Sequence, residues 1–375
     1  MGKRQPFDLK SPEAQALRDE IVHGTFVKEG TLVAFPLCFP GCSVPVVADE
    51  SHVTALDVGP NWMVYGGTSG RAAHLFVGMF HGATGMVLDL GVVKDATHCA
   101  TICCGTKRFV AFVNGPGGGR AVARALQGLP FDLLQEWGFG RQPLEDLGPV
   151  VQGERVLHAV RTPGRDRIVG VTERHLFTMG ADAGKPEVVG EVPGAARLAV
   201  GSKGSVFGLD EGHTLWRYSP ASARLKRRAV RLPEGPWGTS HRQDACATVM
   251  WARDPASGRL YTADDEGHLY SFVEGRGFGE RLGKTRFAPV GPMAATADGR
   301  IYGPCGEGIA RFFCYNPATG DLSDLGCAVS VIERRRYGYV FGDAATGRDG
   351  QLYFGEDDDL GHLWIYFPRI LPRKA

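Results

Sequence analysis

Short runs in which apolar and polar residues alternate recur along the whole chain, and glycine or other turn residues separate them. Gly258–Thr262 and Gly299–Gly303 are typical, because each starts at a glycine and continues into aliphatic and aromatic residues. Runs of this length and alternation predict β-strands rather than helices. Seven segments of this kind can be aligned, at Asn61–Tyr65, Lys107–Ala111, Asp166–Gly170, Gly204–Gly208, Gly258–Thr262, Gly299–Gly303 and Gly350–Phe354.

Each of these segments belongs to a larger repeating unit of four predicted strands. A run of small residues precedes the segment, as in His98–Ile102. Another run follows it, as in Gly267–Tyr270, and a turn such as Tyr315–Gly320 leads to the last run. The units recur about every 48 residues. Four-stranded units at intervals of roughly 40–50 residues are typical of β-propeller blades.

The last unit has one strand fewer than the others. It ends in its third run, at Ile365–Pro368, whereas an unassigned apolar run lies at Thr31–Phe35. A strand taken from the N-terminal part would close the ring and remove an open sheet edge. We therefore predict an all-β protein, a single seven-bladed β-propeller of four-stranded blades whose last blade is closed by an N-terminal strand. Six or eight blades remain alternatives, since the unit at 156–194 has the weakest pattern.

Two segments do not follow the blade pattern. Ser11–Val22 predicts a short helix on the outside of the ring, with Ser11 as its N-cap and Pro12 at the first helical position. Leu129–Trp137 is an insertion in the second blade that can also form a helix. The resulting domain prediction is a helical extension at 1–23 followed by the propeller at 24–375.

Composition supports a folded protein and narrows the possible partners. Apolar residues make up 43% of the chain, charged residues make up 22%, and the formal net charge is +1. This balance excludes a disordered chain and gives no basis for a nucleic-acid partner. No apolar run of 18 residues is present, so we expect no membrane partner. The first residues lack the apolar segment of a secretory signal, which predicts a cytoplasmic protein, or a periplasmic or secreted one if a signal has been removed. We also predict a monomer.

The cysteines give no sign of a metal or redox site. There are nine, and no two of them form a Cys-x-x-Cys pair, which argues against a zinc ribbon or a thioredoxin-type site. His98 lies close in sequence to three of them, but strand alternation sends the side chains to both faces. We predict buried, reduced thiols, no cofactor and no metal site. A divalent ion with a structural or charge-neutralising role remains an open alternative.

The loops that lead into the innermost strands form one face of a propeller, here called the top face, and ligands usually bind there over the axial channel. Arginine binds carboxylates through two hydrogen bonds. Histidine and tyrosine can exchange protons when their pKa values are shifted. These loops contain all three residue types. The candidate catalytic residues are His98, His241, Tyr337 and Tyr339, and the candidate substrate-binding residues are His52, Arg242, Arg334, Arg335 and Arg336.

Each candidate also has a structural alternative. A histidine in such a loop can simply hold the backbone, and the arginines at 334–336 can be a solvated run of charge. The acidic loops around Asp264 and Glu356 lack the spacing of a calcium loop, which predicts tight turns with solvated carboxylates. Five further histidines lie at or next to the start of third strands and are predicted to be structural: His74, His175, His213, His268 and His362.

The closing stretch of the chain, Tyr339–Glu356 followed by Gly361–Pro368, resembles the last blade of seven-bladed bacterial propellers that act on carbohydrates. These are the polysaccharide lyases that act on ulvan or on rhamnosyl-glucuronate linkages, together with related rhamnosidase-like hydrolases. The resemblance implies an acidic oligo- or polysaccharide substrate and cleavage by β-elimination beside a uronic acid. It also implies that arginine neutralises the uronate carboxylate, while histidine and tyrosine move the protons.

Carried to this chain, the resemblance makes Arg242 and one of Arg334–Arg336 the neutralising residues. His98 or His241 would be the base, and Tyr337 or Tyr339 the acid. A non-catalytic propeller that binds a glycan or a protein is the competing prediction. An axial cavity with clustered histidine, tyrosine and arginine would favour an enzyme over this binder. A glycoside hydrolase is a third possibility, with Asp244 or Asp343 as its first candidate acids.

Overall fold

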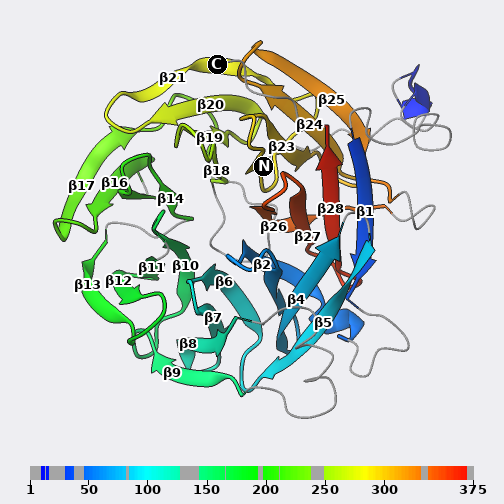
Figure 1. Cartoon of the computed structure of the whole chain (residues 1–375). Coiled ribbons are helices and arrows are strands. Elements are labelled where there is room, and N and C mark those ends of the chain that lie inside the picture. Colours follow the sequence, from blue (N-terminus) through cyan, green and yellow to red (C-terminus); the bar gives the residue numbers. More distant parts are fainter. Residues whose placement is uncertain are drawn as a thin grey trace.

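Seven four-stranded antiparallel sheets surround a central axis in the computed structural model of the chain (Figure 1). The structure describes residues 10–12, 14–16, 30–37, 46–81, 84–126, 143–164, 166–192, 197–210, 212–237, 249–330 and 337–369. In each sheet one strand lies near the axis and the other three follow outward. The predicted all-β, seven-bladed propeller is therefore confirmed, and six or eight blades are excluded.

The first four blades follow one another along the chain. Blade 1 is β2 (His52–Val58), β3 (Val64–Ser69), β4 (Ala73–His81) and β5 (Thr84–Val93). Blade 2 is β6 (His98–Cys104), β7 (Arg108–Gly115), β8 (Gly118–Ala125) and β9 (Glu145–Pro149). Blade 3 is β10 (Val156–Arg161), β11 (Arg167–Thr172), β12 (His175–Gly180) and β13 (Glu187–Glu191). Blade 4 is β14 (Ala199–Val200), β15 (Val206–Leu209), β16 (Thr214–Ser219) and β17 (Arg224–Arg231).

The remaining blades complete the ring. Blade 5 is β18 (Ala252–Arg253), β19 (Leu260–Ala263), β20 (His268–Val273) and β21 (Gly277–Lys284). Blade 6 is β22 (Ala294–Ala295), β23 (Ile301–Cys305), β24 (Arg311–Asn316) and β25 (Asp321–Cys327). Blade 7 is β26 (Phe341–Thr346), β27 (Leu352–Glu356), β28 (His362–Pro368) and β1 (Gly30–Pro36). A 3₁₀ turn, η1 (Ala48–Glu50), precedes blade 1.

Blade 7 is closed by the N-terminal strand, as predicted. β1 pairs antiparallel with β28, and Val33 lies opposite Ile365. Leu32 is fully buried in the same apolar cluster as Trp364 and Tyr366. The closing strand therefore contributes both backbone hydrogen bonds and core packing to the last blade.

The glycine and the aromatic residue of the repeat face each other across neighbouring strands. Gly170 on β11 lies opposite Phe177 on β12, and Gly208 on β15 lies opposite Trp216 on β16. A Cβ atom on either glycine would come within 2.2 Å of the opposing ring. Glycine therefore makes room for a large buried ring within the blade, and this packing explains why the pattern recurs.

The start of the predicted N-terminal helix is also present. The backbone N–H of Ala14 donates to Ser11 Oγ at 3.1 Å, and that of Gln15 donates to the Ser11 carbonyl at 3.0 Å. This helical turn lies outside the ring (Figure 1). The predicted helix at Leu129–Trp137 lies outside the described residues. In the described ranges, no helix has the length and apolar character needed to cross a membrane.

Candidate functional site

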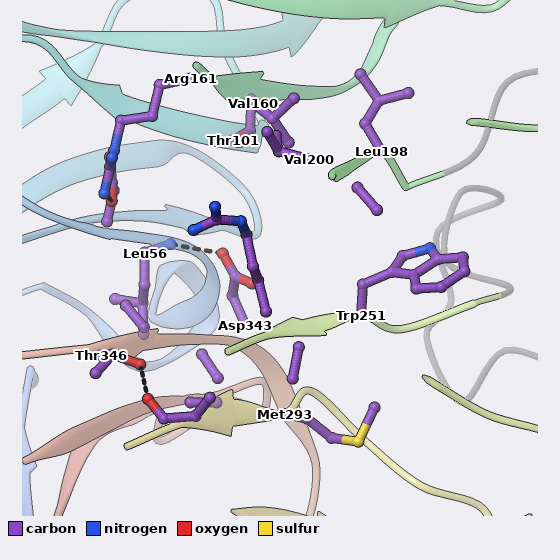
Figure 2. A pocket seen from close by; sticks show the side chains of 18 of the residues that line it. Leu56, Thr101, Val160, Arg161, Leu198, Val200, Trp251, Met293, Asp343 and Thr346 are labelled. Atoms are coloured by element: carbon purple, nitrogen blue, oxygen red, sulfur yellow. Dashed lines mark hydrogen bonds and ion pairs between the residues drawn. The ribbon is translucent and has the colours of Figure 1, made fainter. Parts of the chain in front are cut away.

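A cavity of about 720 Å³ lies on the axis of the ring. Residues of all seven innermost strands, or directly next to them, line it: Leu56, Thr101, Val160, Leu198, Trp251, Met293 and Thr346 (Figure 2). It extends to the loops that leave these strands, which form the bottom face and contribute Pro163, Pro255, Ala297 and Arg348. The residues with which the longer innermost strands begin, His52, His98, Val156 and Phe341, do not line it.

An ion pair crosses the upper part of this cavity. Arg197 precedes β14 in blade 4, and its Nη1 lies 2.9 Å from Oδ1 of Asp343 in blade 7. Its Nη2 donates to the Gly342 carbonyl at 2.8 Å. The other Asp343 oxygen accepts the backbone N–H of Leu56 in blade 1, also at 2.8 Å (Figure 2). Three blades are thus tied together on the axis.

A second ion pair joins blades 1 and 3. Arg161 at the end of β10 donates from Nε and Nη2 to the two oxygens of Asp57, at 2.9 and 3.2 Å. Asp57 also accepts the backbone N–H groups of Val58 and Cys104. The carboxylate raises the pKa of Arg161, although burial opposes this effect. Asp57 is therefore fully engaged within the protein.

Arg253 ends the innermost strand of blade 5 and has no such partner. Its register position, opposite Leu260, matches that of Arg161 opposite Ile168. Its Nε is buried and has no hydrogen-bond partner within the described residues. Burial lowers the pKa of Arg253, and the nearby Arg161 lowers it further against the opposing influence of Asp254.

Trp251 supplies the aromatic surface of the cavity. It is half-buried, and its ring lies 6.4 Å from that of Phe278 behind it. Figure 2 shows Trp251 with Leu198 and Met293 on one side of the cavity, and Arg161 and Leu56 on the other. His158 also lines the cavity, and its Nδ1 accepts the backbone N–H of Leu198 at 3.2 Å.

His52, a predicted substrate-binding residue, is engaged with two carboxylates. Its Nδ1 lies 3.1 Å from Asp357 and its Nε2 lies 3.0 Å from Asp359. The hydrogen bond with Asp357 is the main cause that raises the pKa of His52 to about 9. The imidazole is therefore protonated at neutral pH and links blade 1 to a loop of blade 7.

His98, a predicted catalytic residue, takes part in a chain of hydroxyl groups between blades 1 and 2. Its Nδ1 lies 2.8 Å from Ser69 Oγ, which lies 2.6 Å from Thr54 Oγ1. Thr54 donates to the Cys99 carbonyl at 2.7 Å. Because each hydroxyl has one proton, the chain is satisfied when His98 Nδ1 donates to Ser69. This arrangement fixes the ring beside the strand rather than in the axial cavity.

The two predicted catalytic tyrosines also lie away from the cavity lining. Tyr337 forms an isolated antiparallel bridge with Val329, and Tyr339 is 42% exposed. The structure therefore does not bring His98, Tyr337 and Tyr339 together around the cavity. The other candidates, His241, Arg242, Arg334, Arg335 and Arg336, lie outside the described residues.

Four residues of the cavity, Arg161, Arg197, Arg253 and Trp251, are not among the site residues predicted from the sequence. Their signal is a bulky or charged residue inside, or next to, the run of small residues that precedes each glycine-led strand. If the small-residue runs of the seven units are aligned, Arg161 and Arg253 fall at the same position, the last residue of an innermost strand. The hydrolase candidate Asp343 accepts the backbone N–H of Leu56 on one oxygen and the Arg197 guanidinium on the other, so both oxygens are engaged within the protein. The other hydrolase candidate, Asp244, lies outside the described residues.

Four of the third-strand histidines, His74, His175, His268 and His362, pair with carboxylates of the fold, whereas His213 is exposed. The prediction for the acidic loops was partly wrong: they are turns with exposed carboxylates at Glu266 and Asp359, but the first carboxylate of each loop is buried. Asp264 is 2% exposed and its Oδ2 lies 2.9 Å from His268 Nδ1, while Glu356 is fully buried. Glu154 pairs with His175 in the same way, at 3.0 Å. Each of these buried carboxylates pairs with a histidine of its own blade. Asp264 and Glu154 also accept backbone N–H groups, and Glu356 accepts the indole N–H of Trp364. Among the described residues, no three His, Cys, Asp or Glu side chains are placed to hold a metal ion.

Comparison with known proteins extends this picture only at the level of the fold. The sequence matches no family model and no curated protein. Similar solved structures include extracellular domains of the proposed hybrid two-component systems BT3049 and BT4673 of B. thetaiotaomicron, with TM-scores of 0.58 and 0.56, identities of 13% and 11%, and 90% and 92% of this chain covered. This chain spans only 41% and 40% of the length of those two solved extracellular domains. At such identities the likeness shows a shared propeller fold, and nothing in it favours a lyase or a rhamnosidase-like protein.

Proposed function

We propose that the chain is a carbohydrate-binding propeller that holds an acidic saccharide in its axial cavity without cleaving it. The observation that carries this proposal is the half-buried Trp251 in the wall of a cavity that also contains arginines. Sugar rings bind to aromatic faces through their C–H groups, and arginine recognises carboxylates. A mostly apolar cavity with a few convergent polar groups is the usual form of a small-ligand site.

A lyase needs more than the described lining of this cavity supplies. β-Elimination requires a neutral base beside the carbon that loses its proton and an acid beside the leaving oxygen. His52 is already protonated near neutral pH, and neither His98 nor Tyr339 lines the cavity. His158 does line it, but the Nδ1 of its ring already accepts the backbone N–H of Leu198. A binding protein requires no such pair, so the described residues favour binding over catalysis. The likeness to extracellular domains of signalling proteins is compatible with ligand recognition as the task of this fold.

The test is a titration of the purified protein with short uronate-containing oligosaccharides, followed by calorimetry. We expect binding with neither new ultraviolet absorbance from an unsaturated uronate nor new reducing ends. Trp251→Ala should weaken binding by about tenfold, or ~1.4 kcal/mol. Tyr339→Phe is the matched control, because Tyr339 is exposed and does not line the cavity. Product formation that Tyr339→Phe abolishes would replace this proposal with the lyase, and an absence of binding across the panel would overturn it.

A further inference from the structure

Positive charge is concentrated in the axial cavity. Its lining contains four arginines, Arg161, Arg197, Arg253 and Arg348, and two aspartates, Asp57 and Asp343, which leaves a formal charge of +2. The whole chain has a net charge of only +1. The excess is therefore a property of this site rather than of the protein surface. Charges in a concave site with apolar walls act on a ligand more strongly than charges on an open surface.

The two aspartates cannot neutralise this excess. Asp57 receives two hydrogen bonds from Arg161 and two from backbone N–H groups. Asp343 receives Arg197 on one oxygen and a backbone N–H on the other. Each carboxylate is thus matched to one arginine. Neither aspartate of the described cavity lining pairs with Arg253 or Arg348. Asp254 lies next to Arg253 outside this lining and attracts it electrostatically, but it also accepts hydrogen bonds from Ala256 N–H and Ser257 Oγ.

Arg253 and Arg348 lie at the bottom of the cavity, where the innermost strands end. Arg253 is the last residue of β18, and Arg348 follows β26 by two residues. The Arg348 guanidinium stacks on the exposed ring of Trp62, with 3.4 Å to its centroid. Stacking of this kind fixes the plane of a guanidinium while its N–H groups, which lie in that plane, remain available to an acceptor. The Nε of Arg253 is buried and has no acceptor in the described part of the chain.

We infer that Arg253, supported by Arg161 and Arg348, forms an oxyanion subsite at the bottom end of the axial cavity, which binds the carboxylate of an acidic sugar. In naming a sugar as the ligand this inference rests on the proposed function, but the subsite itself does not. A carboxylate there would accept hydrogen bonds from the part of the Arg253 guanidinium that lines the cavity, and it would offset the repulsion between neighbouring guanidinium groups. The sugar ring would then extend upward along Trp251. The charged end of the ligand thereby points toward the bottom face, whereas the site predicted from the sequence lies in the loops of the top face.

The experiment compares charged and uncharged forms of one ligand. A short uronate oligosaccharide and its methyl ester differ only in the carboxylate charge, and each is titrated calorimetrically into the protein and into Arg253→Gln. We expect the wild-type protein to bind the acid at least tenfold more tightly than the ester, and this preference to fall as salt is added. Arg253→Gln should lose the preference while still binding the ester. Arg276→Gln is the matched control, because Arg276 lies in an exposed turn of the same blade and the net charge changes equally.

Inorganic sulfate, titrated alone, separates the two proposals. If no saccharide binds but sulfate binds the wild-type protein and not Arg253→Gln, the proposed function fails and the oxyanion subsite stands. If acid and ester bind equally and Arg253→Gln changes neither, the subsite is overturned and saccharide binding stands. If nothing binds, both are overturned. Should Arg253→Gln fail to fold, Arg253→Lys replaces it, because lysine retains the charge without the planar guanidinium. A variant that still prefers the acid to the ester tenfold, but no longer binds sulfate, would contradict the inference.

Discussion

Arg197 and Asp343 form an ion pair across the axis of the ring, with 2.9 Å between Nη1 and Oδ1. The two residues are 146 positions apart and belong to blades 4 and 7, which lie across the ring from each other (Figure 1). Their side chains are only 10% and 14% exposed. This pair therefore links blades 4 and 7 through the centre of the ring, whereas β1 closes the ring by pairing with β28 in blade 7.

Arg197→Gln and Asp343→Asn should each lower the free energy of unfolding by about 3 kcal/mol, because each leaves a buried charge without its partner. The double variant should cost less than the sum of the two, since the charges disappear together. Urea unfolding of all four proteins measures this coupling. Arg155→Gln serves as a control, because its partner Glu173 is exposed and the expected change is below about 0.5 kcal/mol. Additive single effects would contradict direct pairing.

His52 should stabilise the fold in a pH-dependent way. Its pKa rises from 6.5 in the unfolded chain to about 9 in the protein, mainly through Asp357. Its contribution is therefore fully present below pH 6.5 and is lost as the pH rises through about 9. We expect His52→Gln to lose about 1–2 kcal/mol at pH 6, after allowance for solvent screening of the partly exposed ring. The difference between the two proteins should disappear near pH 10, and a difference that does not vary with pH would refute the assignment.

The fold could be predicted from the sequence because each blade solves the same packing problem. The pairing of glycine with an aromatic ring, as in Gly208 with Trp216, produces a local pattern that seven copies reinforce. The closing strand was also predictable, since the apolar run Thr31–Phe35 belongs to no other blade and blade 7 has one strand too few. Contacts within a blade connect residues that are close in sequence, and local patterns report such contacts well.

The axial site could not be predicted in the same way. Arg197 meets Asp343, and Arg161 meets Asp57, only because the ring brings distant blades together on its axis. No periodic pattern specifies these pairs. The same limit explains the error about the acidic loops: composition suggests solvated carboxylates, whereas the third strand buries Asp264 against His268.

Closure by β1 should be worth a large part of the stability of blade 7. Leu32 is fully buried with Trp364 and Tyr366, so Leu32→Ala should cost about 2–4 kcal/mol of unfolding free energy. Thr31→Ala, at an exposed position near the start of the same strand, should change it by less than about 0.5 kcal/mol. Thermal and urea unfolding measure both variants. Equal effects at the two positions would argue that β1 adds no core packing.

The thiols should be largely unreactive in the native protein. Six of the nine cysteines are buried as free thiols: Cys99, Cys103, Cys104, Cys305, Cys314 and Cys327. Burial raises the pKa of Cys99 and Cys305 to about 12, so the reactive thiolate is scarce at neutral pH. The other three, Cys38, Cys42 and Cys246, lie outside the described residues. An aromatic disulfide reagent should therefore label at most three cysteines before denaturation and all nine afterwards. Rapid labelling of more than three in the folded protein would show that the blades open more readily than their packing implies.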